Sequence, residues 1–183
     1  MLTVQATNAT TVLVMTSAYV PPSTTLSNVP LVISTDGSAL GNPGPTGWCW
    51  YVNDQNWLSG GVPHGTNNLG ELTAVRQALV ATAGLDRPIV LECDSKYAIS
   101  AVTQWSYNWR RNGWVTSSGS AVANKEIIEA TLDLLVGRNV RFVWVRGHSG
   151  NPRNEAADVR AKDAASRARG GTGIIIGPGL RSI

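Results

Sequence analysis

The sequence predicts an α/β domain in which a mixed five-stranded sheet, three antiparallel strands followed by two parallel ones, carries helices on both faces. Three observations lead to this prediction. Three strand-like segments come first, strand-like and helical segments alternate after them, and the last helical segment carries regularly spaced alanines. The chain has 183 residues, which is room for one ordinary domain with modest extensions.

The first three strands are predicted close together in the sequence. Residues 31–35 form a short run of apolar and β-branched residues, and residues 47–52 and 56–62 follow at short distances. These segments are near enough to one another to pair as a meander. The first long helix follows them, because apolar residues recur there at helical spacing and a glycine stop signal ends the pattern: Leu72, Val75, Leu79, Ala83 and Gly84.

The remaining elements alternate between strand and helix. Residues 89–93 read as a buried strand, and short helices are expected at residues 96–103 and around Trp105. Asn124 can cap a helix that runs to Val136, and residues 140–145 form the last predicted strand. The final helix opens at Asn151 and Pro152 and carries an alanine stripe: Ala157, Ala161, Ala164, Ala165 and Ala168.

The two ends of the chain differ from the middle in composition. Residues 1–29 contain no charge and are predicted to be an extension, with one strand at residues 10–16. Residues 169–183 are rich in Gly and Ile and are predicted to be a linker and tail. The domain itself is therefore expected at residues 30–168.

The composition excludes several classes of protein. Hydrophobic residues make up 43% and charged residues 15%, no apolar stretch reaches the roughly 18 residues of a membrane span, and the first basic residue is Arg76. We therefore expect a cytoplasmic protein that folds without a membrane. Cys49 and Cys93 have no CxxC spacing, so they predict neither a disulfide nor a zinc site.

Charge is distributed unevenly along the chain. Residues 1–75 hold three charged residues, all acidic, whereas the rest hold 15 basic and nine acidic residues, a net charge of +6. A basic second half suggests a polyanionic partner, and a solvated basic surface would give the same composition.

Four of the 12 acidic residues stand at predicted strand ends and helix starts. Asp36 and Asp94 end strands, Glu71 begins the first long helix, and Asp158 lies near the start of the last helix. Taken singly, each fits a turn, a cap or a favourable place at a helix dipole. Together they would repel strongly without cations, and oxygen ligands of this kind suit pairs of Mg²⁺ or Mn²⁺ ions.

Several motifs in register resemble type 1 ribonuclease H in its bacterial form. The resemblance spans roughly residues 30–168 and departs from the family at both ends of the chain. The motifs that carry it are Thr35-Asp36-Gly37-Ser38, Gly41-Asn42-Pro43-Gly44-Pro45, Thr66-Asn67-Asn68 with Glu71-Leu72, Cys93-Asp94-Ser95-Lys96-Tyr97, and Trp144-Val145-Arg146-Gly147-His148-Ser149-Gly150 with Asn154-Glu155 and Asp158.

The resemblance implies an endonuclease that cuts the RNA strand of an RNA–DNA hybrid with two Mg²⁺ ions, Mn²⁺ being the alternative. It implies that the four carboxylates hold the metals, with Asp36 bridging the two ions and Asp158 on the side of the nucleophile. It also implies that His148 assists proton movement or product release. A histidine in a loop is otherwise usually a solvated residue, and we interpret His64 in that way.

The resemblance also implies a set of contacts to nucleic acid. Asn42, Asn67 and Asn68 would line the minor groove and sense the 2′-hydroxyls, and Thr66 and Asn124 would grip a DNA phosphate. Turn-forming and helix-capping roles explain these residues equally well when they are taken singly. Trp105, Arg110 and Arg111 resemble the family's basic protrusion, with the arginines as phosphate contacts and Trp105 expected to pack the helix.

Two rival functions stay open for this sequence. One is another nuclease or strand transferase on the same fold, integrase-like or junction-cutting. The other is a non-catalytic hybrid-binding module that has lost its metals. All four acids and the Asp-Gly-Ser and Thr-Asn-Asn motifs are present, which favours a ribonuclease H that acts as a monomer.

Overall fold

The computed structural model describes residues 28–171 and 173–181, so the strand predicted at residues 10–16 lies outside the described residues. In chain order the elements are β1 (Leu31–Ala39), β2 (Gly44–Asn53), β3 (Asn56–Gly65), α1 (Asn67–Ala81), β4 (Ile89–Cys93), α2 (Lys96–Ser100), the π-helical η1 (Ala101–Trp105), α3 (Ser106–Arg111), α4 (Lys125–Asp133), β5 (Val140–Trp144), α5 (Pro152–Ala168) and β6 (Ile174–Gly179).

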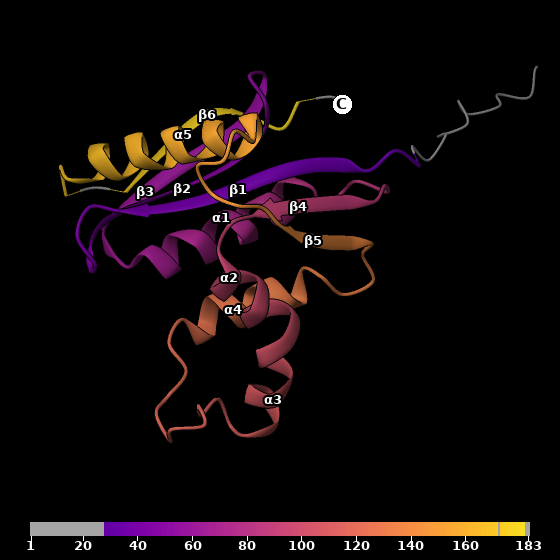
Figure 1. Ribbon diagram of the computed structural model, residues 1–183, viewed down its shortest axis with the longest axis vertical. Coiled ribbons are helices and arrows are strands. Elements are labelled where there is room, and N and C mark those ends of the chain that lie inside the picture. The colour runs from indigo at the N-terminus through magenta and orange to yellow at the C-terminus, as the bar shows by residue number, and fades with distance from the viewer. Residues whose placement is uncertain (1–27, 172, 182–183) are drawn as a thin grey trace, which may run out of the picture.

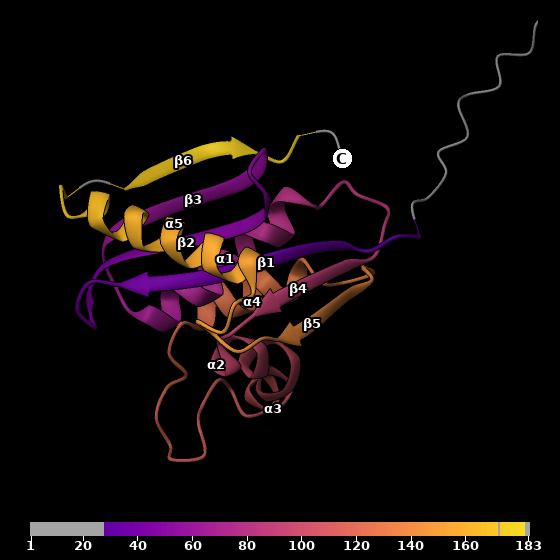
Figure 2. The same ribbon diagram turned by 45° about the horizontal axis from the view of Figure 1, so that its top comes forward.

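The described strands form one mixed sheet in the order β5-β4-β1-β2-β3-β6 (Figure 2). β1, β2 and β3 form an antiparallel meander, and β4 and β5 run parallel to β1. This confirms the predicted fold class and the arrangement of the first five strands. The prediction of five strands was one too few.

The sixth strand comes from the segment that we expected to be a linker and tail. β6 pairs antiparallel with β3, placing Ile174 opposite Gly61 and Ile176 opposite Ser59. Three consecutive isoleucines favour an extended backbone, and β3 would otherwise present a free edge. The sequence pattern of this short segment did not show which edge it could join.

Helices cover both faces of the sheet (Figure 1). Side chains alternate along β2, so that Trp48 and Trp50 enter the core formed with α1, while Cys49 and Tyr51 pack with alanines of α5. α4 packs beside α1 on its face of the sheet. The central strands are therefore packed on both of their faces.

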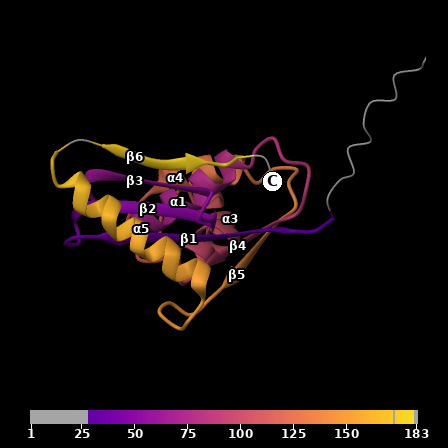
Figure 3. The same ribbon diagram turned by 90° about the horizontal axis from the view of Figure 1, so that it is seen from above.

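α5 confirms the alanine stripe predicted for it, and Figure 3 shows this helix lying across the central strands. The five predicted alanines are completely buried, which lets the helix backbone approach the sheet closely. Asn151 caps the helix, because its Oδ1 accepts hydrogen bonds from the backbone N–H groups of Arg153 at 3.1 Å and Asn154 at 3.3 Å.

The start of α4 differs from its prediction. Asn124 precedes the helix, but its backbone is left-handed, with φ of 61°, and its side chain makes no capping hydrogen bond. A capping side chain requires an extended backbone at that position, so the left-handed residue cannot cap in the predicted way. The helix also ends at Asp133 and not at Val136.

Candidate active site

The pairing of the central strands brings Asp36 and Asp94 side by side. β1 and β4 run parallel, with Thr35 opposite Cys93, so an aspartate follows each of these two residues. Asp94 comes directly after β4, but Asp36 lies inside β1 and not at the strand end predicted for it, because β1 stays paired with β2 as far as Ala39. Asp36 is 5% exposed, and one oxygen of its carboxylate accepts a hydrogen bond of 2.7 Å from the N–H of Gly37. The parallel register thus places two carboxylates side by side.

Glu71 reaches the same place from the other face of the sheet. Its helix, α1, is capped by Thr66, whose hydroxyl accepts a hydrogen bond of 3.2 Å from the N–H of Leu69. β1 and α1 touch at Gly37, where an added Cβ would lie 2.2 Å from the backbone nitrogen of Glu71. This close approach places the buried Glu71 beside the strand ends, and ligand atoms of Glu71, Cys93 and Asp94 lie within 4.8 Å of one another.

Asp158 and His148 complete the cluster from α5 and the loop before it. The Asp158 side chain is 16% exposed, and its Oδ2 lies 2.7 Å from Nζ of Lys162 and 3.9 Å from Nδ1 of His148. The loop lies directly against Asp94, since a Cβ on Gly147 would be 2.6 Å from the Asp94 Oδ2. His148 has a φ of 51° and a side chain that is 73% exposed.

The clustering raises the pKa of three of these carboxyl groups. Burial raises the pKa of Asp36 most, and the charges of Asp94 and Asp158 raise it further. Glu71 has its pKa raised by burial and then by the charges of Asp36 and Asp94. The pKa of Asp94 is raised by burial and by the charge of Asp158. A bound cation would offset this cost of ionisation, so the set of carboxyl groups is a candidate cation site.

The donor atoms fit a hard divalent cation. Glu71 Oε2 is buried without a hydrogen-bond partner, as expected for an oxygen that has a ligand role. Cys93 lies in the same group, but burial raises the pKa of its thiol, so it remains protonated and is a poor ligand. The carboxylate oxygens are therefore the groups that could hold Mg²⁺ or Mn²⁺.

Two further residues of the site had no role in the sequence prediction. Lys162 forms an ion pair with Asp158 one helical turn earlier, a spacing that could have been read from the sequence. Asn154 is 2% exposed and lies close enough to Asp94 to lower the pKa of that carboxyl group, although its buried Nδ2 has no partner at full hydrogen-bond geometry. Its burial beside β4 depends on how α5 packs on the sheet, which the sequence pattern did not show.

The predicted groove residues on the first turn of α1 lie next to Glu71. Asn42 Oδ1 accepts a hydrogen bond of 3.1 Å from the N–H of Asn67, and a hydrogen bond from the Asn67 side chain lowers the pKa of Glu71. Asn68 is exposed beside it, and Thr66 precedes both. The structure thus brings these four residues together with the carboxylate cluster.

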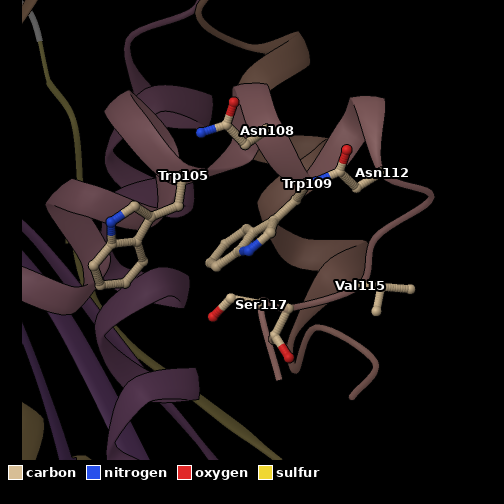
Figure 4. Close-up of a pocket in the computed structure, with 7 residues that line it drawn as sticks. Trp105, Asn108, Trp109, Asn112, Val115 and Ser117 are labelled. Carbon is tan, nitrogen blue, oxygen red and sulfur yellow. The ribbon is translucent and has the colours of Figure 1, made fainter. Parts of the chain in front are cut away.

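The predicted protrusion is a separate region built from η1, α3 and the loop that follows. Trp105 and Trp109 line a hollow of about 390 Å³, shown in Figure 4, and their ring centroids are 5.6 Å apart. Trp105 is 41% exposed, so it is less enclosed than the packing role predicted for it. Arg110 is 3.6 Å from Asp133, and Arg111 lies over the ring of Tyr107.

A mixed sheet whose central strands and flanking helices bring four carboxylates together fits the class of divalent-metal-dependent nucleases. The sequence matches the RNase H family over residues 28–166. The chain belongs to the RNase H family.

Known relatives agree with this assignment. The chain is 47% identical to Ribonuclease H of Tropheryma whipplei strain Twist, over 84% of this chain and 96% of that protein. It is 43% identical to Ribonuclease HI of Streptomyces coelicolor, over 73% of this chain and 61% of that protein. Among solved structures, LC9-RNase H1, a type 1 RNase H, matches with a TM-score of 0.61 and 28% identity over 85% of this chain and 79% of that one.

The raised pKa values predict that the metal-free protein loses stability as the pH rises from about 5 to about 8. Between the unfolded values, near 4, and the raised folded values, the folded state binds more protons, so stability falls with pH. One pKa unit corresponds to about 1.4 kcal/mol, and 1 kcal/mol to about 3 °C in a domain of this size. We therefore expect the Tm in chelator to fall by at least about 3 °C.

Calorimetry at several pH values, with chelator and with Mg²⁺, checks this expectation. Mg²⁺ should restore the Tm most at pH 8, because it replaces the protons that the carboxylates have lost. Asp36→Asn should flatten the pH dependence in chelator. A Tm that is level or rising between pH 5 and 8 in chelator contradicts the interpretation of the cluster.

Proposed function

We propose that this chain is an endonuclease that hydrolyses the RNA strand of RNA–DNA hybrids with two Mg²⁺ ions and leaves 5′-phosphate and 3′-hydroxyl ends. The observation that carries the proposal is the convergence of four carboxylates, two of them 5% exposed, at one end of the sheet. Bound there, two ions would lower the pKa of the attacking water and neutralise charge on the departing 3′ oxygen.

The positions of the four carboxylates support distinct roles. Asp36 lies on the central strand β1, and the charges of Asp94 and Asp158 act on its carboxyl group, which supports our assignment of Asp36 as the carboxylate that would bind both ions. Asp158, on α5, would hold the ion on the side of the nucleophile. His148 is exposed at the edge of the cluster, 3.9 Å from Asp158, where it can exchange protons with solvent and help a product leave.

Selection of a hybrid would depend on the amides beside the cluster. The 2′-hydroxyl of RNA both donates and accepts hydrogen bonds, and Asn42, Asn67 and Asn68 offer both kinds of atom next to Glu71. Thr66 and Asn124 would contact a phosphate of the DNA strand. Asn124 supports this role because its side chain makes no capping bond and so keeps its donors available.

The hollow of Trp105 and Trp109 would receive the DNA strand. Aromatic side chains can stack on sugars and bases. Arg110 and Arg111 lie on α3, the helix that carries Trp109, and place positive charge there for contacts with phosphates. Arg110 is 49% exposed, and its 3.6 Å contact to Asp133 is weak enough at the surface to exchange for a phosphate.

We propose that the protein acts as a cytoplasmic monomer. No helix in the described part of the chain is long and apolar enough to cross a membrane. Light scattering of the purified full chain tests the oligomeric state.

A cleavage assay with three duplexes tests the proposed function. We expect the RNA strand of a labelled RNA–DNA hybrid to be cut in Mg²⁺ and left intact in chelator, with RNA–RNA and DNA–DNA duplexes intact in both. Binding of the hybrid without cleavage would favour the non-catalytic module. Cleavage of all three duplexes would favour another nuclease on this fold.

A further inference from the structure

Beside the carboxylate cluster lies a second polar cluster, centred on Glu92 of β4. The Glu92 carboxylate accepts hydrogen bonds from both ends of the Arg153 fork, Nε to Oε2 at 3.2 Å and Nη2 to Oε1 at 3.1 Å. It also accepts one from Ser34 Oγ at 2.7 Å and one from Asn151 Nδ2 at 3.4 Å. The Glu92 side chain is 13% exposed and the Arg153 side chain 43%, so this is a partly shielded charge pair with bidentate geometry, which is stronger than a single contact between exposed charges.

Glu92 and its partners belong to three parts of the fold that carry or adjoin the proposed metal ligands: β1, β4 and the start of α5. Ser34 precedes Asp36 by two residues on β1, and Glu92 precedes Asp94 by two on β4, so each pair lies on one face of its strand. Asn151 and Arg153 form the start of α5, which carries Asp158. The cluster therefore joins the beginning of α5 to β1, which holds Asp36, and to β4, which Asp94 follows.

Other ion pairs of α5 cannot fix the helix to these strands. Lys162 with Asp158 and Arg167 with Asp163 are contacts within the helix, and Arg160 reaches Asp54, whose side chain is 85% exposed. Among the described residues, the Arg153–Glu92 pair is the one ion pair between α5 and a central strand. The repulsion among three aspartates opposes the approach of α5, and the Arg153–Glu92 pair adds a fixed contact close to them, beyond the buried alanines that pack α5 on the sheet.

We propose that Glu92 and Arg153 are positioning residues that set the place of Asp158 relative to Asp36 and Asp94, and thereby the affinity of the site for divalent cations. The inference rests on the proposed function, since it assigns metal binding to the same carboxylates. Neither residue contacts substrate or metal in this role. Partners that orient metal ligands typically change metal affinity by about 10–100-fold when they are removed.

The test is isothermal titration of Mn²⁺ into the full-length protein without nucleic acid, well below the unfolding temperature. Glu92→Gln and Arg153→Gln should each weaken Mn²⁺ binding by about tenfold or more, and the double variant should be little worse than either, because both changes remove one contact. Arg153→Lys should keep part of the affinity. Arg167→Gln, which removes an exposed ion pair of the same helix, is the matched control and should bind as wild type.

The two single variants separate positioning from simple charge effects. Glu92→Gln removes a negative charge and Arg153→Gln a positive one, so an electrostatic effect alone would shift the affinity in opposite directions. A purely structural pair would lower the urea midpoint and leave the Mn²⁺ affinity of the folded protein unchanged. Three outcomes would each overturn the proposal: shifts of the Mn²⁺ affinity in opposite directions, a lower urea midpoint with unchanged Mn²⁺ affinity, or affinities within about twofold of wild type in both variants.

Hybrid cleavage by the wild-type protein is measured in parallel, so the two proposals can fail separately. Unchanged Mn²⁺ affinity in the variants of a cleaving enzyme overturns the positioning role alone. Weakened Mn²⁺ binding in the variants of a protein that cuts no hybrid supports the positioning role and overturns the proposed function. A wild-type protein that binds no Mn²⁺ overturns both.

Discussion

Replacing Asp94 with Asn is expected to reduce cleavage of an RNA–DNA hybrid by at least about a thousandfold, which corresponds to about 4 kcal/mol of transition-state stabilisation. The substitution keeps the size of the side chain and removes a negative charge that would help to hold a divalent cation in the carboxylate cluster. Hybrid binding should persist, because the amides and arginines proposed to contact the duplex are unchanged. Single-turnover cleavage and fluorescence anisotropy in chelator measure the two effects.

Asp163→Asn is the control for this prediction. Asp163 lies on α5, with a side chain that is 51% exposed and paired with Arg167, so its removal should leave cleavage unchanged. The metal-free Asp94→Asn protein should also be more stable than wild type near pH 8, since one repelling charge is gone. Cleavage by Asp94→Asn at the wild-type rate would remove Asp94 from the metal site.

Replacing Gly37 with Ala is expected to destabilise the protein by about 3 kcal/mol and to impair cleavage in the molecules that remain folded. The added Cβ would lie 2.2 Å from the backbone nitrogen of Glu71 and 2.5 Å from the carbonyl carbon of Gly70, and backbone atoms cannot move aside as a flexible side chain can. α1 would have to withdraw from β1. Glu71 would then leave the cluster.

Urea unfolding and hybrid cleavage measure the two consequences at Gly37. Gly84→Ala provides the matched control, because a Cβ there meets no atom within 4 Å. That substitution should change stability by less than about 1 kcal/mol and leave cleavage unchanged. A Gly37→Ala protein as stable and active as wild type would show that the approach of α1 to β1 does not position Glu71.

Sequence patterns were sufficient to predict those features that lie within a single helix or strand. The alanine stripe of α5, its Asn151 cap and the strand of residues 89–93 needed only spacing and residue type. Asn124 shows the limit of such reasoning, because the residue type suits a cap but the left-handed backbone at this position rules that role out. The φ angle of Asn124 depends on the path of the chain through the protrusion, and the sequence of one helix does not specify that path.

The carboxylate site, too, could be predicted from the sequence only in part. Its members could be chosen because acids are rare in this chain and stand near predicted strand ends and helix starts, although β1 in fact continues past Asp36 to Ala39. Asn154 and Lys162 had no predicted role, although Lys162 stands at helical spacing from Asp158. The burial of Asn154 against Asp94 arises only when α5 packs on the sheet, so its effect on the pKa of Asp94 required the folded structure.

The sequence alone determined the fold class, the order of the first five strands, the membership of the carboxylate cluster and the resemblance to the RNase H family, because periodicity and motifs are local properties. Only the tertiary structure decided that β6 closes the edge of β3, that Gly37 lets Glu71 approach Asp36, and that Arg153 holds Glu92 beside the site. These features depend on distances between segments that are far apart in the chain. Such distances are set by packing, which no single segment specifies.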